Sequence, residues 1–450
     1  MNFKNSSKLK LTNTLYNKYI WVYLLLCSLF SVSVVTNNIS PYILIYSIGI
    51  ILVLIISPFN LKFTLIMIAF GLSIRLILSF LIPHIIIYDD ELGYTRMARD
   101  TVLGWLLDEK QLLIKNAWAN VVAVLFFLFD DSISAVKAFN NIVGIITAFV
   151  LCRIAQKIYK DNLITICVLI SSLFLPPNML ISSIVLKEQF MAFLLVLLLY
   201  TLVCHQDGLS LIHFGVISYL FILFRSSVGY MLLFPLGIIK VIKIYNLKSN
   251  LGVVKQVILI FFLSISIFVI IVNYSKIKNI KSHSIQFVLG EDKRGLKTLT
   301  NSSAKYTQFI DKKNLFSIKN IVLIPLRCLF SPSPLRPLKN PQKAVYLESL
   351  MITSWLYIGM PFFILGAFFS IRSLTKMIPV ILFVLIFLMA SLSILSYAPE
   401  TLRFMLQGIP IFFMVAIYGY FISKKTFVRK VVLSLWIFSI VTFNVVYIVL

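Results

Sequence analysis

Long apolar runs separated by short polar segments dominate the chain. Runs of roughly 17 to 22 apolar residues recur along it, and this length spans a bilayer core of about 30 Å. The runs lack the alternation of membrane β-strands, and most lack the polar stripe of a soluble amphipathic helix. Because backbone groups in lipid must be satisfied internally, we predict an all-α fold, a polytopic bundle of transmembrane helices.

Hydropathy over windows of about 19 residues predicts about 13 spans. Their approximate ranges are 20–36, 41–58, 62–83, 138–155, 163–180, 189–204, 209–224, 228–243, 256–273, 349–371, 377–396, 405–422 and 430–449. One further apolar segment, 121–129, is short. It is predicted to be a short span, a re-entrant piece or an interfacial helix.

Composition and charge agree with a membrane protein. The 450 residues are 60% hydrophobic and 13% charged, whereas globular chains average about 45–50% apolar and about 25% charged residues. The net charge of +25 is explained by Lys and Arg in cytoplasmic loops, and no nucleic-acid motif accompanies it. We therefore expect membrane lipid as a partner and no nucleic acid. The five cysteines are scattered and have no CxxC spacing, so they are interpreted as packing residues.

The distribution of basic residues predicts the orientation of the spans. The Lys-rich N-terminal tail and the basic segments 153–160, 240–255, 372–376 and 423–430 are expected inside. This places the C-terminus outside, provided that 121–129 does not cross. We expect a multi-pass protein of a bacterial cytoplasmic membrane with a cytoplasmic N-terminus. Three regions follow: a membrane module at 1–273 with a first outer loop at 84–116, a large extracytoplasmic loop at 274–348, and membrane helices at 349–450.

An acidic cluster follows the third predicted span. Asp89, Asp90 and Glu91 are consecutive in a chain with only 16 acidic residues. Clustered carboxylates repel one another, and such a cluster serves as a general base, a divalent-metal site or both. Helical spacing places Tyr94 and Met97 on the face of Asp90, and Ala98 on the face of Glu91. A solvated helix start is the ordinary alternative, since Asp suits that position.

Three other polar groups fall on the same predicted outer face. Lys187 and Glu188 open one span, Arg225 lies between two spans, and Arg403 precedes another. A Lys-Glu pair at the mouth of a span is costly unless it faces a cavity or pairs internally, and Arg suits the binding of phosphate or pyrophosphate. Helix capping and snorkelling to lipid phosphate are the alternatives.

Four short motifs resemble the membrane glycosyltransferases of the GT-C superfamily, in particular bacterial members similar to protein mannosyltransferases. They are Asp-Asp-Glu-x-x-Tyr-x-x-x-Ala from Asp89, the segment Val136 to Gly144, Ser-x-x-x-Leu-Lys-Glu ending at Glu188, and Thr401-Leu-Arg403 with Pro410. The resemblance covers roughly residues 85–230 and 395–420. Three predicted spans precede the acidic cluster, where many family members have one.

The resemblance implies a mechanism and roles for these residues. Asp89, Asp90 or Glu91 would be the catalytic base, and Asp89 and Asp90 would hold Mg²⁺ or Mn²⁺ in a metal-dependent member. Lys187, Arg225 and Arg403 would bind the phosphate of a polyprenyl-phosphate sugar donor, with Tyr94 and Glu188 also in the substrate site. An acceptor hydroxyl would attack the anomeric carbon while the polyprenyl phosphate leaves.

Two other functions stay open from the sequence. An O-antigen or repeat-unit polymerase is favoured by the basic outer loop, with Arg294, Arg327 and Arg336. A polysaccharide flippase or transporter requires charges at mid-membrane depth, for which Arg75 in the third span is the main candidate. The acidic cluster favours the glycosyltransferase.

Overall fold

The computed structural model describes residues 41–81, 89–107, 116–204, 209–224, 236–237, 239–240, 343–393, 405–424 and 426–449. Every regular element within these ranges is an α-helix, which confirms the predicted all-α class. The helices are α2 (Pro41–Ile56), α3 (Leu61–Leu81), α4 (Asp89–Leu106), α5 (Ala117–Leu128), α6 (Ile133–Tyr159), α7 (Asn162–Phe174), α8 (Pro176–Ser182), α9 (Glu188–Cys204), α10 (Leu209–Phe224), α17 (Lys343–Ser370), α18 (Leu374–Ser393), α20 (Ile409–Ile422) and α21 (Phe427–Val449).

Two of these helices, α3 and α6, are long and apolar enough to cross a membrane, and α7 with α8 forms a third candidate bent by 49°. The other apolar helices contain shorter apolar stretches. The predicted spans 20–36 and 256–273 lie outside the described residues, so the full set of about 13 spans stays a prediction. The segment 121–129 falls in α5, whose 12 residues rise about 18 Å, less than a bilayer core.

The chain divides into two compact units. The first comprises Met1–Arg153 and Met179–Leu186, and the second comprises Ile154–Asn178 and Lys187–Leu450. The predicted loop 274–348 lies outside the described residues, except that α17 begins at Lys343, within its C-terminal end.

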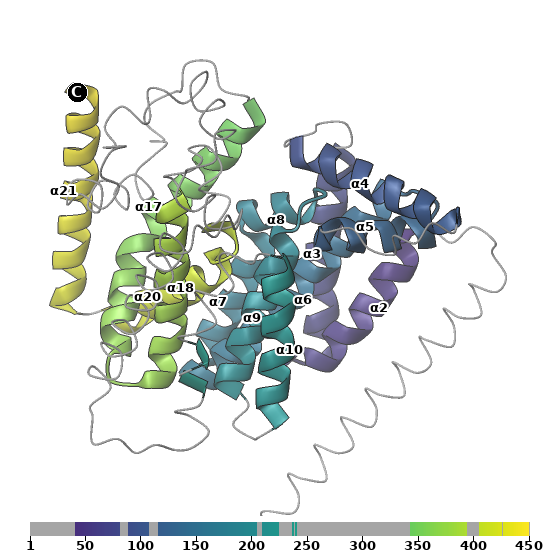
Figure 1. The fold of residues 1–450 in the computed structure, drawn as a ribbon. Coiled ribbons are helices and arrows are strands. Elements are labelled where there is room, and N and C mark those ends of the chain that lie inside the picture. Colours follow the sequence, from purple (N-terminus) through teal and green to yellow (C-terminus); the bar gives the residue numbers. More distant parts are fainter. Residues whose placement is uncertain are drawn as a thin grey trace, which may run out of the picture. The chain divides into compact units, whose positions relative to one another are not determined.

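In the first unit, α4 packs closely on α5, as Figure 1 shows. Asn116 caps α5 by accepting hydrogen bonds from the backbone N–H groups of Trp118 and Ala119, which would otherwise be unsatisfied at the helix start. Trp118 and Phe126 of the same helix are buried in the core.

In the second unit, α17 packs most extensively on α20, with α18 and α21 beside them, and Figure 1 shows these helices in green and yellow. Glycines permit this close approach: a Cβ atom at Gly419 would overlap the carbonyl oxygen of Phe362, and one at Gly366 would overlap that of Val415. Next to them, the Phe363 ring stacks on Phe412 with centroids 5.1 Å apart.

Candidate functional site

A buried, non-helical segment in the first unit organises the candidate site. Residues 183–186 follow α8 and precede α9, and all four are buried. A non-helical backbone leaves N–H and C=O groups without the partners that a helix supplies, and leaving such groups unpaired in an apolar interior is costly. The Ser183 and Ile184 N–H groups donate to the Leu180 and Ile181 carbonyls of α8, and side chains from other helices supply further partners.

Asn140 on α6 satisfies two carbonyl groups of this segment. Its Nδ2 donates to the carbonyl oxygens of Ile184 at 2.7 Å and Leu186 at 3.0 Å. The Asn140 side chain is fully buried, so both hydrogen bonds are shielded from water. One amide thus fixes the backbone on both sides of Val185.

Glu91 on α4 holds Val185, which lies between these two carbonyl groups. Its Oε2 accepts a hydrogen bond from the Val185 backbone N–H at 3.1 Å, and the residue is only 8% exposed. The carboxylate also interacts electrostatically with Lys137, which is buried on α6. Lys137 lies three residues before Asn140, and this spacing places both side chains on one face of α6.

Arg75 on α3 is a buried cation at the edge of the segment. Its Nε donates to Ser182 Oγ at 3.0 Å and its Nη1 to the Gly71 carbonyl at 3.2 Å. Ser183 Oγ donates to the Arg75 carbonyl at 3.4 Å. Nη2 has no hydrogen-bond partner among the described residues. A buried arginine in an apolar helix marks a candidate functional position.

A neighbouring polar group links three helices. Asn141 Nδ2 lies 3.0 Å from Tyr46 Oη of α2 and 3.0 Å from Ser79 Oγ of α3. Ser79 lies one helical turn beyond Arg75, on the same face of α3. We define the buried polar cluster as Arg75, Ser79, Glu91, Lys137, Asn140, Asn141, Ser182 and Ser183.

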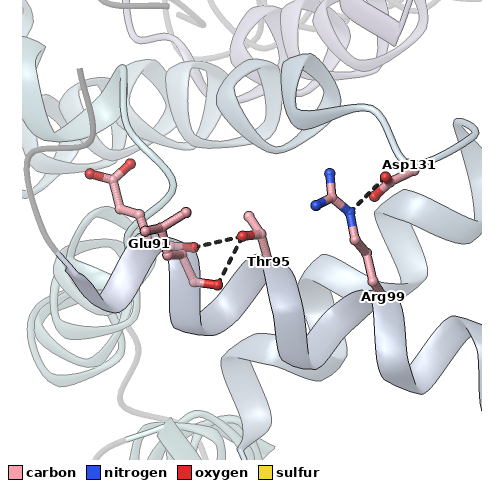
Figure 2. A network of polar contacts seen from close by, with 5 residues as sticks. Glu91, Thr95, Arg99 and Asp131 are labelled. Atoms are coloured by element: carbon pink, nitrogen blue, oxygen red, sulfur yellow. Dashed lines mark hydrogen bonds and ion pairs between the residues drawn. The ribbon is translucent and has the colours of Figure 1, made fainter. Parts of the chain in front are cut away.

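The polar face of α4 continues away from Glu91 one turn at a time (Figure 2). Thr95 Oγ1 donates to the Glu91 and Leu92 carbonyls, both at 3.0 Å, so its hydroxyl is satisfied within the helix. Arg99 Nε lies 2.7 Å from Asp131 Oδ2, with both side chains about half exposed. An exposed pair of this kind contributes about 0–1 kcal/mol, so it orients α4 against the α5–α6 turn more than it stabilises the fold.

The predicted site residues divide between the two units. Glu91 and Tyr94 are both buried in the first unit. In the second unit, Lys187 Nζ donates to the Phe224 carbonyl at 3.4 Å, and Glu188 is buried as the first residue of α9.

The other predicted site residues have no described side chains. Asp89 and Asp90 are the first two residues of α4, but their side chains lie outside the described residues, as do Arg225 and Arg403 entirely. Within the part of the chain that is described, no three His, Cys, Asp or Glu side chains gather as a metal site. The metal predicted on Asp89 and Asp90 therefore stays a prediction.

Local sequence patterns do not predict most of this cluster as a site. Lys137, Asn140 and Asn141 fall within the segment Val136 to Gly144, which resembles a GT-C motif, and Arg75 is predicted only as the mid-membrane charge of a transporter. A usable signal was present, because adjacent amides and a lysine inside an apolar helix need buried partners.

Comparisons with known proteins add no relative. No protein-family model, no curated protein and no solved structure matches the chain.

Proposed function

We propose that the chain is a multi-pass membrane glycosyltransferase of surface-polysaccharide or O-antigen assembly. It moves a sugar or glycan from a polyprenyl-phosphate or polyprenyl-pyrophosphate carrier to an acceptor at the outer face of a bacterial cytoplasmic membrane. The observation that carries the proposal is the buried Glu91 carboxylate at the start of α4, which accepts a hydrogen bond from the Val185 N–H and interacts electrostatically with Lys137. The resemblance of the acidic motif to GT-C enzymes supports the same function.

The chemistry of the transfer requires a base and a positive surrounding. Attack by an acceptor hydroxyl on an anomeric carbon releases a proton, which a positioned carboxylate accepts. Glu91 is oriented for this role because one of its oxygens is fixed by the Val185 N–H. The carrier phosphate leaves with negative charge, and fixed cations stabilise that charge. Arg75 and Lys137 outnumber the single carboxylate of the buried polar cluster, which suits an anionic leaving group.

The remaining predicted residues keep separate roles in this proposal. Lys187, Arg225 and Arg403, which belong to the second unit, bind the carrier phosphate, and Asp89 and Asp90 are the alternative bases. Mg²⁺ or Mn²⁺ bound by Asp89 and Asp90 would supply additional positive charge at the carrier phosphate. Such a metal needs further ligands, and Glu91 is already engaged with Val185 and Lys137.

Replacing the acidic residues tests the proposed catalytic role. Glu91→Gln keeps an oxygen for the Val185 N–H but removes the base, and general-base catalysis typically contributes about 10²–10⁴-fold. We expect surface glycan made by this variant to disappear from a gel of whole-cell polysaccharide. Asp89→Ala and Asp90→Ala test the two alternative bases in the same assay.

The matched control is Asp100→Asn, which alters an exposed carboxylate on the same helix and is expected to leave the glycan unchanged. Normal glycan from all three acidic variants contradicts the proposal. A ladder that collapses to a single repeat would instead identify a polymerase. Membrane levels of each variant, measured by immunoblot, separate lost catalysis from lost protein.

The proposed orientation is tested by cysteine labelling. Leu92 is 47% exposed beside Glu91, and Leu92→Cys in an otherwise cysteine-free chain is expected to react with an impermeant maleimide in intact cells. Lys424→Cys, on the predicted cytoplasmic side, is expected to react only after permeabilisation. The opposite pattern would invert the topology and exclude chemistry at the outer face.

A further inference from the structure

One end of the second unit gathers the termini of four helices. Gly359 of α17 lies against Phe412 of α20, and Gly366 lies against Val415 further along both helices. The two helices are therefore parallel, and their C-terminal ends lie at the same end of the unit. Turns at 371–373 and 423–424 precede α18 and α21, which begin at Leu374 and Phe427, so these two helices begin at the same end.

The C-terminal end of α6 joins this group. Tyr159 stacks on Tyr418 of α20 with ring centroids 4.3 Å apart and planes inclined by 13°. Lys376 Nζ donates to Tyr418 Oη at 3.2 Å. Three segments that are distant in sequence, 157–161, 371–376 and 423–430, thus meet at one end of the unit.

These segments are strongly basic. We define the basic end by its described cations: Lys157, Lys160, Arg372, Lys376, Lys424, Arg429 and Lys430. The three segments contain one acidic residue, Asp161, whose carboxylate accepts the Ile164 N–H as the N-cap of α7. Most of the cations are exposed, so the end carries a concentrated positive charge that faces outward.

Two of the cations are held on aromatic rings. The Arg429 guanidinium lies 4.9 Å from the Tyr420 ring centroid and 5.6 Å from that of Phe362. Lys376 Nζ lies 5.0 Å from the Tyr418 centroid. Cation–π contacts fix such side chains while leaving the charge available, and Tyr residues combined with Lys or Arg are typical of the headgroup level of a membrane.

Exposed apolar side chains continue from the basic end along the same helices. They lie on α17 and α21 and comprise Ile358, Ile364, Phe368, Leu435, Ile437, Phe438 and Val441. A soluble anion or a nucleic acid would bind the cations but would leave this apolar surface uncovered. A phospholipid matches both parts, because its phosphate meets the cations while its acyl chains cover the apolar side chains.

We propose that the basic end binds the phosphate groups of anionic phospholipids. Each Lys or Arg near a membrane surface strengthens attachment to anionic lipid by about fivefold, so the charges act together. The site belongs to the second unit and involves none of the residues in the buried polar cluster. Its success or failure is therefore independent of the proposed transferase activity.

Native mass spectrometry of the purified full-length chain tests this site. The detergent micelles contain phosphatidylglycerol in one sample and phosphatidylcholine in another. We expect preferential retention of phosphatidylglycerol. The exposed pair Lys424→Gln and Lys430→Gln should lower that retention roughly 25-fold, the product of two charges at about fivefold each.

The matched control replaces two exposed cations of the first unit, Lys62→Gln and Arg96→Gln, and should retain lipid as the parent does. Unfolding temperatures in detergent verify that both double variants fold. Equal retention of the two lipids, or equal losses in both double variants, overturns the proposal. Displacement of the lipid by millimolar inorganic phosphate would assign the site to free phosphate and also overturn it.

Discussion

Replacing Gly419 by alanine is expected to separate α17 from α20. Among glycine-to-alanine substitutions at the described positions, we expect this one to lower the stability of the protein most. The new Cβ atom would overlap the Phe362 carbonyl oxygen and approach the Gly366 backbone. Backbone atoms cannot rotate away as a side chain can, so the two helices must move apart. Overpacking of this kind costs about 1–3 kcal/mol, and occasionally more. We expect the free energy of unfolding to fall by about 3 kcal/mol. The loss is detected as a lower unfolding temperature in detergent, followed with a thiol-reactive dye.

The chain offers a matched control for this substitution. Gly215 lies in α10, and a Cβ atom there meets nothing within 4 Å. Gly215→Ala therefore adds the same methyl group without a clash, and we expect no loss of stability. If Gly419→Ala and Gly215→Ala unfold at the same temperature, the result contradicts the close approach of α17 and α20 at Gly419.

The second large effect is expected at Asn140. Replacement by leucine keeps a similar side-chain volume but removes the amide that donates to the Ile184 and Leu186 carbonyls. Each buried acceptor left unpaired costs about 1–3 kcal/mol, so the loss of two partners should lower the free energy of unfolding by about 2–6 kcal/mol. The segment 183–186 would lose the hydrogen bonds on both sides of Val185, which leaves the bond from Val185 to Glu91 and the bond from Ser183 to Arg75.

The comparison for Asn140→Leu is Asn162→Leu, an exposed position at the first residue of α7. We expect that control to change the unfolding temperature little. Limited proteolysis adds a local measurement, since cleavage near residue 185 should accelerate only in Asn140→Leu. Wild-type stability and wild-type cleavage in Asn140→Leu would show that the segment does not depend on this amide.

Helix content was predictable because apolar run length is a local property of the chain. The predicted ranges 62–83 and 209–224 correspond to α3 and α10 within a few residues. The predicted span 163–180 is instead bent by 49° where α7 gives way to α8. Pro176 and Pro177 lack the N–H groups that would continue the hydrogen bonding of α7, so the sequence contained the reason for this break.

The acidic cluster is an intermediate case. Its sequence identified Glu91 as a candidate acid, and it predicted the shared face of Glu91 and Ala98, which are both buried. The sequence of the cluster did not indicate which residues pack against that face of the helix. The roles of Asp89, Asp90, Arg225 and Arg403 stay predictions from motif and resemblance, because their side chains lie outside the described residues.

The sequence by itself determined an all-α chain rich in apolar helices, because hydrophobicity and helical hydrogen bonding are set over a few turns. Only the tertiary structure decided which polar side chains meet. Glu91 reaches Val185 across 94 positions, and Asn140 reaches Ile184 across 44. No local pattern specifies such a pairing, because it results from how the helices pack and from the cost of leaving buried backbone groups unpaired.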